Sequence, residues 1–142
     1  MFDTSHLHPM LVHFPIALIM VGFIAEVSSL IVKKELCLSK FSLYLLVLGT
    51  LATMVTWLSG VLLTAEMSGT AGSVKESHEL FAIVSMLLLI ITSTIRLMIV
   101  FGKKDNKNLK WIAFCLYGLA AFTVSITGYL GGTLVYNYMM PL

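Results

Sequence analysis

Four apolar runs dominate this 142-residue chain, and each is long enough to cross a bilayer as a helix. They cover about residues 10–32, 41–64, 77–101 and 109–138. In hydrocarbon the backbone finds no water to bond, so a span must be a helix or part of a closed barrel. Barrel strands are about ten residues of alternating character, which these runs are not. We therefore predict an all-α integral membrane four-helix up-down bundle, with 1–142 as a single domain.

The composition excludes several classes of protein. Hydrophobic residues make up 58% of the chain and charged residues only 11%, whereas soluble domains carry about 25% charge. A net charge of +2 without a basic stripe argues against nucleic-acid binding. The sequence has no nucleophile and base at the spacing of a known catalytic motif, and it has no glycine-rich loop of the kind that binds phosphate. The sequence therefore favours a carrier or binding protein over an enzyme, with the lipid bilayer as its first partner.

Basic residues predict how the spans are oriented. Most of them fall between the first and second spans or between the third and fourth: Lys33, Lys34, Lys40, Lys103, Lys104, Lys107 and Lys110. The positive-inside rule places both connections in the cytoplasm. Both termini are then expected on the outer face.

The two halves of the chain resemble each other in layout. His8 precedes Lys33 by 25 residues, and His78 precedes Lys103 by the same interval. Each half then returns through a helix with glycine near its outer end. Two tandem hairpins in an up-down bundle would put the first and third helices on one diagonal.

All four histidines, His6, His8, His13 and His78, lie at or near the outer ends of the first and third spans. An imidazole in or near a bilayer is costly without a partner. Histidines on diagonal helices could supply two nitrogens to the iron of one haem b. We predict His13 and His78 as the axial ligands, because His13 alone is embedded in apolar sequence. His8 is the substitute, since it precedes Glu26 by 18 residues, as His78 precedes Arg96. The alternative is that these histidines are solvated tail residues or bond to backbone or acids.

Glycines on the second and fourth spans accompany the histidines. Small residues recur there at steps of three and four, which marks one face of each helix. Such a face lets membrane helices pack closely. It could also leave room for a porphyrin, with a pocket wall of Gly60, Gly128, Gly131 and Gly132.

Two further hypotheses stay open. A zinc, copper or iron ion could be bound or transported by the outer histidines, with Glu66 or Glu79 as a carboxylate ligand. Met10 and Met67 are alternative soft ligands. The chain could also be a cofactor-free structural subunit of a membrane complex.

Two local patterns bear on the helices themselves. Glu26 and Arg96 each stand seven residues before a lysine pair, which predicts a structural ion pair across the bundle. Ser73 and Glu76 have the spacing of a capping box, which predicts a third helix that starts near Val74.

The run HPMLVHFPIAL at 8–18 resembles the N-terminal signature of uncharacterised small bacterial membrane proteins with four helices, grouped as a domain of unknown function. The resemblance extends to His78 and to the late glycine segment at 128–136. It implies a multi-pass, four-helix protein of the bacterial inner membrane, in which the lysine distribution places both termini on the periplasmic side. It implies no established activity.

Together these patterns favour a small cytochrome-b-like protein with one haem b near the periplasmic face. One haem near one face cannot carry electrons across the bilayer alone. Electron transfer would therefore need a quinone or redox protein partner, and association into a homo-oligomer stays open.

Overall fold

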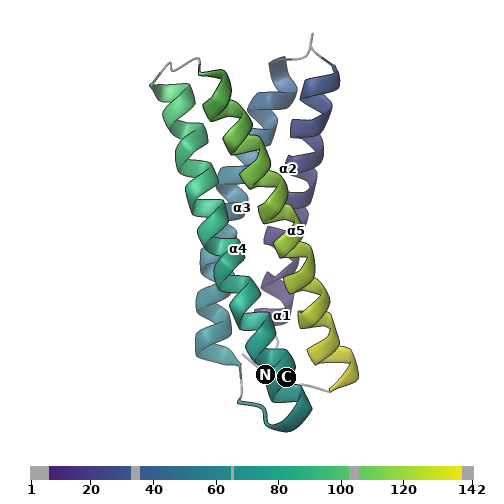
Figure 1. The fold of residues 1–142 in the computed structure, drawn as a ribbon. Helices are drawn as coiled ribbons and strands as arrows, with labels where there is room; N and C mark the ends of the chain where they lie inside the picture. The colour runs from purple at the N-terminus through teal and green to yellow at the C-terminus, as the bar shows by residue number, and fades with distance from the viewer. Residues whose placement is uncertain (1–6, 33–35, 65, 103–105, 139–142) are drawn as a thin grey trace.

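In the computed structural model every regular element of the described residues is a helix, and no strand occurs among them (Figure 1). The described residues are 7–32, 36–64, 66–102 and 106–138. The helices are α1 (Leu7–Leu11), α2 (His13–Ile31), α3 (Leu36–Leu63), α4 (Gly69–Phe101) and α5 (Lys107–Asn137).

Four helical segments are long and apolar enough to cross a membrane: His8–Ile31, Cys37–Leu63, Gly69–Phe101 and Lys107–Asn137. The first of them consists of α1 and α2. Large apolar side chains cover the outside of the bundle, Phe14, Leu62, Phe101 and Phe122 among them. Exposing such an apolar surface to water would be unfavourable, whereas the acyl chains of a bilayer are suited to it.

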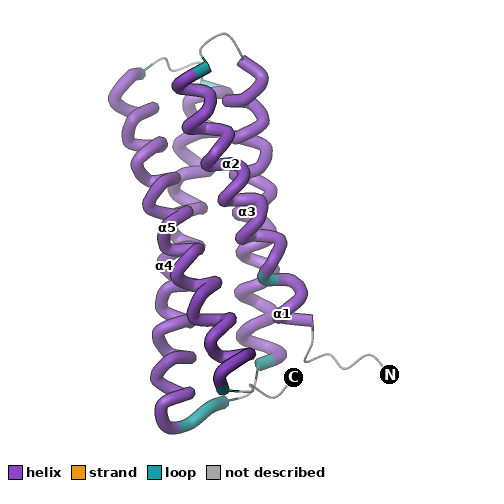
Figure 2. The backbone as a smooth tube through the Cα atoms, turned by 90° about the vertical axis from the view of Figure 1, so that its right-hand side faces the viewer, coloured by secondary structure: helices purple, strands orange, loops and turns teal. Residues whose placement is uncertain are grey.

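The helices pack as two hairpins, α2 with α3 and α4 with α5 (Figures 1 and 2). Smaller contacts join α3 to α4 and α2 to α5. The first and third spans therefore lie on one diagonal, and the prediction of an all-α up-down bundle is confirmed. We call the end with Lys40, Lys107 and Lys110 the lysine end, and the end with His8 and His78 the histidine end.

Large side chains from all four spans fill the centre of the bundle, and those of α2 pack against glycines of its neighbours. Ile19, Leu46, Leu89 and Tyr117 are fully buried there. Gly49 of α3 faces Ile19, and Gly118 of α5 faces Phe23. The small-residue faces predicted from the sequence thus serve helix packing in the middle of the bundle.

The hydrogen-bond ladder of the first span is interrupted between α1 and α2 (Figure 2), although Val12 between them keeps a helical conformation and donates to the carbonyl of His8. Proline has no backbone N–H, so Pro15 cannot donate to the carbonyl of Leu11 four residues earlier. Instead the Thr56 hydroxyl of α3 donates to that carbonyl at 3.5 Å. The interruption therefore follows from Pro15, and the carbonyl of Leu11 that it leaves without a donor accepts from the next helix.

α4 begins at Gly69, earlier than the predicted capping box allows. Ser68 precedes the helix in an extended conformation, and Gly69 has a φ of +68°, which suits glycine. Ser73 lies inside the helix and donates to the carbonyl of Thr70. The prediction of a start near Val74 is wrong because Ser73 bonds backward into an existing turn.

An ion pair crosses the bundle on the α2–α4 diagonal, toward the lysine end. Both terminal nitrogens of Arg96 donate to the Glu26 carboxylate, Nη2 to Oε2 at 2.8 Å. Nη2 also donates to the carbonyl of Ser39 at 3.4 Å. Both side chains are largely buried, so each charge depends on the other.

Gly22→Ala should destabilise the bundle. A Cβ at this position would collide with the hydroxyl of Tyr117 and press on Leu45. Overpacking of this kind costs about 1–3 kcal/mol. We expect a lower midpoint of thermal unfolding in detergent by circular dichroism, partly restored when Tyr117→Phe removes the hydroxyl. Gly132→Ala is the control, because a Cβ there meets nothing within 4 Å. Equal midpoints for both glycine variants would contradict this packing.

Removing either partner of the ion pair should cost more than removing both. Glu26→Gln leaves the Arg96 cation buried without a counter-charge, a loss of about 3–5 kcal/mol. The double variant Glu26→Met with Arg96→Met leaves no uncompensated charge and should recover most of that stability. The thermal-unfolding midpoints of the wild type, the two single variants and the double variant form a double-mutant cycle, which measures the interaction between the two charges. Strictly additive losses would mean that the two charges do not support each other.

Candidate functional site

The histidine end brings together two imidazoles from the two diagonal spans. His8 comes from α1 and His78 from α4, and both are partly buried. They stand at the same end of the bundle, His8 against Ser59 and Gly60 of α3 and His78 against Thr127 and Gly131 of α5.

His8 points from α1 onto α3. Its Nδ1 is 2.8 Å from the Ser59 hydroxyl, and that hydroxyl also donates to the carbonyl of Thr56. Because the Ser59 proton is given to Thr56, the hydroxyl is free to accept a hydrogen bond from His8 Nδ1. The imidazole Cε1 lies 3.0 Å from where a Cβ of Gly60 would stand. Glycine thus lets this ring approach α3 closely.

His78 makes the corresponding contacts in the second hairpin. Its Nδ1 is 3.0 Å from the backbone carbonyl of Thr127 on α5. A carbonyl only accepts, so Nδ1 carries the proton and the neutral ring has a bare Nε2. The ring Cε1 lies 3.1 Å from the Cβ position of Gly131. Each hairpin therefore supplies one histidine, one oxygen that bonds to its Nδ1, and one glycine next to its ring.

His13 does not join this pair. Its side chain is exposed, and Nδ1 lies 2.8 Å from the carbonyl of Pro9 one turn earlier. The structure thus places His8, the predicted substitute, at the same end of the bundle as His78 with a partner on the next helix, and leaves His13 bonded within its own chain segment. His6 lies outside the described residues.

The four glycines of the predicted pocket wall divide into three kinds. Gly60 and Gly131 face the histidine rings, as described above. Gly128 faces Ile16 of α2, where a Cβ would stand 3.0 Å from Cδ1. Gly132 faces open space. Two of the four therefore contact the histidines directly.

The carboxylates considered as metal ligands are engaged by a buried lysine that the sequence analysis did not single out. Lys75 is 7% exposed, and its Nζ lies 3.3 Å from both Glu66 Oε2 and Glu79 Oε1. The i,i+4 spacing of Lys75 and Glu79 could have indicated this pair. Among the residues that the structure describes, no three His, Cys, Asp or Glu side chains gather as a metal-binding group.

Sequence reasoning also missed the partners that hold the imidazoles. Ser59 and Thr127 were not identified, although each directly precedes a glycine of the predicted pocket wall, Gly60 and Gly128. Thr127 contributes a backbone carbonyl, which carries no side-chain signature. Its hydroxyl stands 3.4 Å from Ser85 of α4, a second link between the same two helices.

The family model described as "Predicted membrane protein (DUF2231)" matches residues 4–141, nearly the whole chain. The chain belongs to this family. No curated protein and no solved structure matched it. The family description agrees with the four apolar spans and states no activity, so chemistry has to be inferred from the site itself.

The hydrogen bond to Thr127 predicts the tautomer of His78. In cofactor-free protein labelled with ¹⁵N-histidine, NMR should find Nδ1 protonated and Nε2 unprotonated for the neutral ring. His13, bonded to the carbonyl of Pro9, should behave alike. Loss of signals in His78→Gln and His13→Gln assigns the resonances. A His78 ring protonated mainly at Nε2 would contradict the arrangement at Thr127.

Proposed function

We propose that this protein is a small cytochrome-b-like membrane protein that binds one haem b at the histidine end for electron transfer. His8 and His78 are the proposed axial ligands. The observation that carries the proposal is that two diagonal spans each place an imidazole at the same end of the bundle, each held through Nδ1 and each set against a glycine.

The donor set suits an iron ligand. Histidines that bind metals commonly give their other ring N–H to a backbone carbonyl or another acceptor, which fixes tautomer and orientation. His78 has this arrangement through Thr127, and His8 has an acceptor in Ser59. Their Nε2 atoms are the ligating positions in this proposal.

The steric setting suits a flat macrocycle as well. Any side chain at Gly60 or Gly131 would press on an imidazole, because the Cβ positions lie 3.0 and 3.1 Å from the ring carbons. Glycines at these two points leave room for the rings beside α3 and α5. Axial ligands and pocket polarity are also what the protein uses to set a haem potential.

A bound haem supplies reversible one-electron chemistry at its iron, and the chain supplies ligands, orientation and an apolar surrounding. We place the protein in the bacterial inner membrane with both termini periplasmic, on the strength of the lysine distribution. The haem would then lie near the periplasmic face. A quinone or a redox protein completes the proposed electron path.

Spectra of histidine variants test the proposal. Detergent-purified protein, expressed with adequate haem or titrated with it, should have an intense Soret band and sharp reduced α and β bands. His8→Ala and His78→Ala should each remove the low-spin spectrum, because each takes away one axial ligand. His13→Ala is the matched control and should keep it, since His13 bonds to Pro9 instead.

Two results would overturn the proposal. Protein that stays colourless after haem titration would exclude a cytochrome. If it then held stoichiometric zinc, copper or iron by elemental analysis, lost in His8→Ala, the non-haem metal hypothesis would replace it. A Soret band that depends on His13 and not on His8 would reject the ligand assignment.

A further inference from the structure

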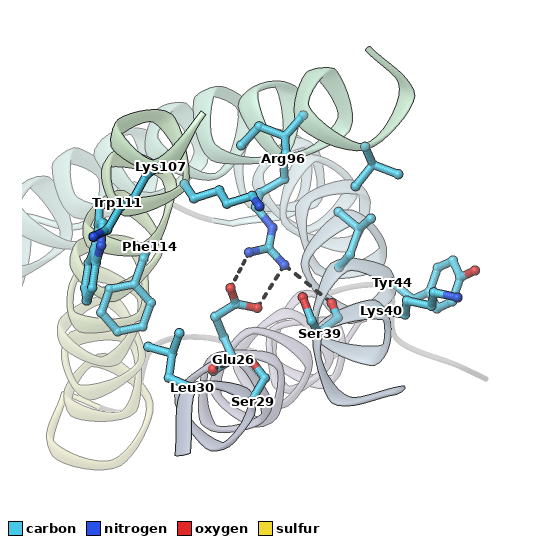
Figure 3. Close-up of a pocket in the computed structure, with 14 residues that line it drawn as sticks. Glu26, Ser29, Leu30, Ser39, Lys40, Tyr44, Arg96, Lys107, Trp111 and Phe114 are labelled. Carbon is cyan, nitrogen blue, oxygen red and sulfur yellow. Dashed lines mark hydrogen bonds and ion pairs between the residues drawn. The ribbon is translucent and has the colours of Figure 1, made fainter. Parts of the chain in front are cut away.

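A pocket of about 620 Å³ lies at the lysine end, and the Glu26–Arg96 pair stands at its centre in Figure 3. All four spans contribute to its walls. Lys40 and Lys107 are exposed and stand on opposite sides of it, so its mouth is polar (Figure 3). One water molecule takes up about 30 Å³, so the pocket has room for many of them.

The guanidinium of Arg96 has more hydrogen-bond donors than the protein uses. It carries five N–H groups. Two of them donate to the Glu26 carboxylate and one donates to the carbonyl of Ser39. Within the described part of the chain no group accepts from the others. A charged donor is costly against hydrocarbon, so its position in the wall of a pocket predicts a polar occupant.

Two buried hydroxyls next to the pocket also lack a protein partner. Among the described residues, neither Ser42 Oγ nor the Tyr117 hydroxyl has a hydrogen bond of normal geometry, although the two lie near each other. Ser42 directly precedes Leu43, and Tyr117 follows Phe114 by three residues, and both Leu43 and Phe114 line the pocket. Buried polar groups without a protein partner are commonly bonded to ordered water, and a water between these two hydroxyls could bond to both.

We propose that the pocket is a water-filled inlet from the lysine end, through which water reaches the Glu26–Arg96 pair and the two hydroxyls beyond it. The Tyr117 hydroxyl lies against Gly22, one turn further from the lysine end than Glu26. Hydrocarbon would satisfy none of these groups, and the ion pair leaves no net charge for an ion to balance. Beyond the hydroxyls the fully buried apolar core closes the bundle.

The inlet places the ion pair in contact with the solution on one side of the membrane only. Its N–H protons can then exchange with water from that side, whereas a pair sealed in lipid would be isolated from both solutions. This proposal is independent of the haem proposal, since it uses none of the same residues.

Cysteine accessibility tests whether the pocket holds water. Leu43→Cys, with Cys37→Ser and Cys115→Ser, leaves one thiol on the pocket wall. Native Cys115, with Cys37→Ser, is the matched control, because it is exposed eight residues into α5, as Leu43 is seven into α3, and does not line the pocket. In vesicles a charged methanethiosulfonate should modify Leu43→Cys more than about tenfold faster than Cys115, because the reactive thiolate forms in water and not in hydrocarbon. Equal rates would overturn the proposal.

A second position and a marker of sidedness complete this experiment. Ile99→Cys repeats the measurement on the wall that α4 supplies, in case Leu43→Cys does not fold. Native Cys37 lies at the start of α3 and marks the lysine end. In oriented vesicles the impermeant reagent should reach either pocket thiol from the side on which it reaches Cys37. Modification from the opposite side would contradict an inlet closed at the core.

Proton exchange at Arg96 tests the contact of the ion pair with water. Arg96 is the only arginine of the chain, so protein labelled with ¹⁵N-arginine shows its guanidinium alone. After transfer to D₂O its side-chain N–H signals should disappear much faster than the signal of its backbone N–H, which lies within α4 and is the internal control. Side-chain signals that last as long as the backbone signal would mean that water does not reach the pair.

Deleting the two hydroxyls tests the inner end of the inlet. Tyr117→Phe and Ser42→Ala each remove one oxygen and little else. If water bonds these hydroxyls, each variant should have a lower midpoint of thermal unfolding in detergent, because a bonded buried hydroxyl contributes to stability. Higher midpoints in both variants would mean that the hydroxyls are buried dry, and would overturn the inner part of the proposal.

Discussion

An ionisable side chain inside a bilayer needs a partner within the protein, because lipid offers none. The Glu26–Arg96 pair satisfies this requirement across the α2–α4 diagonal, with the carboxylate engaged at both oxygens and a further bond to Ser39. A bidentate pair has little freedom in height or rotation. It therefore fixes how the first and third spans stand relative to each other. The histidine end lies at the other end of the same two spans.

At that opposite end the same diagonal carries two imidazoles, and their chemistry differs from that of the ion pair. Glutamate and arginine neutralise each other. His8 and His78 are like groups, so they cannot neutralise each other, and both turn Nδ1 to an oxygen of the neighbouring helix. Each neutral ring held in this way still has one nitrogen to offer. The lysine-end diagonal is closed by its own pairing, whereas at the histidine end the proposed haem would engage both rings.

The four-span fold follows from the length of the apolar runs, and the register of Glu26 with Arg96 follows from counting residues between fixed points. The same counting favours His8 over His13, because His8 precedes Glu26 by the 18 residues that separate His78 from Arg96. The prediction of His13 rests on its apolar surroundings, but in a membrane protein apolar sequence faces lipid as readily as it faces the core. At 3.6 residues per turn, five residues rotate a side chain by about 140°, so the two histidines do not share a face of the helix. His8 accordingly lies against Ser59 of α3, whereas His13 is exposed and bonds to the carbonyl of Pro9. Lys75 was missed because its partner Glu66 precedes α4 and comes near only through the turn into that helix.

The two hairpins each make half of a site. In the first, α1 supplies His8 and α3 supplies Ser59 and Gly60; in the second, α4 supplies His78 and α5 supplies Thr127 and Gly131. Each half supplies one histidine that is held against a glycine, so the proposed function, which needs two such histidines, requires both hairpins. The equal intervals from His8 to Lys33 and from His78 to Lys103 predict equal heights for the two histidines along their helices, whatever apolar residues fill the span between.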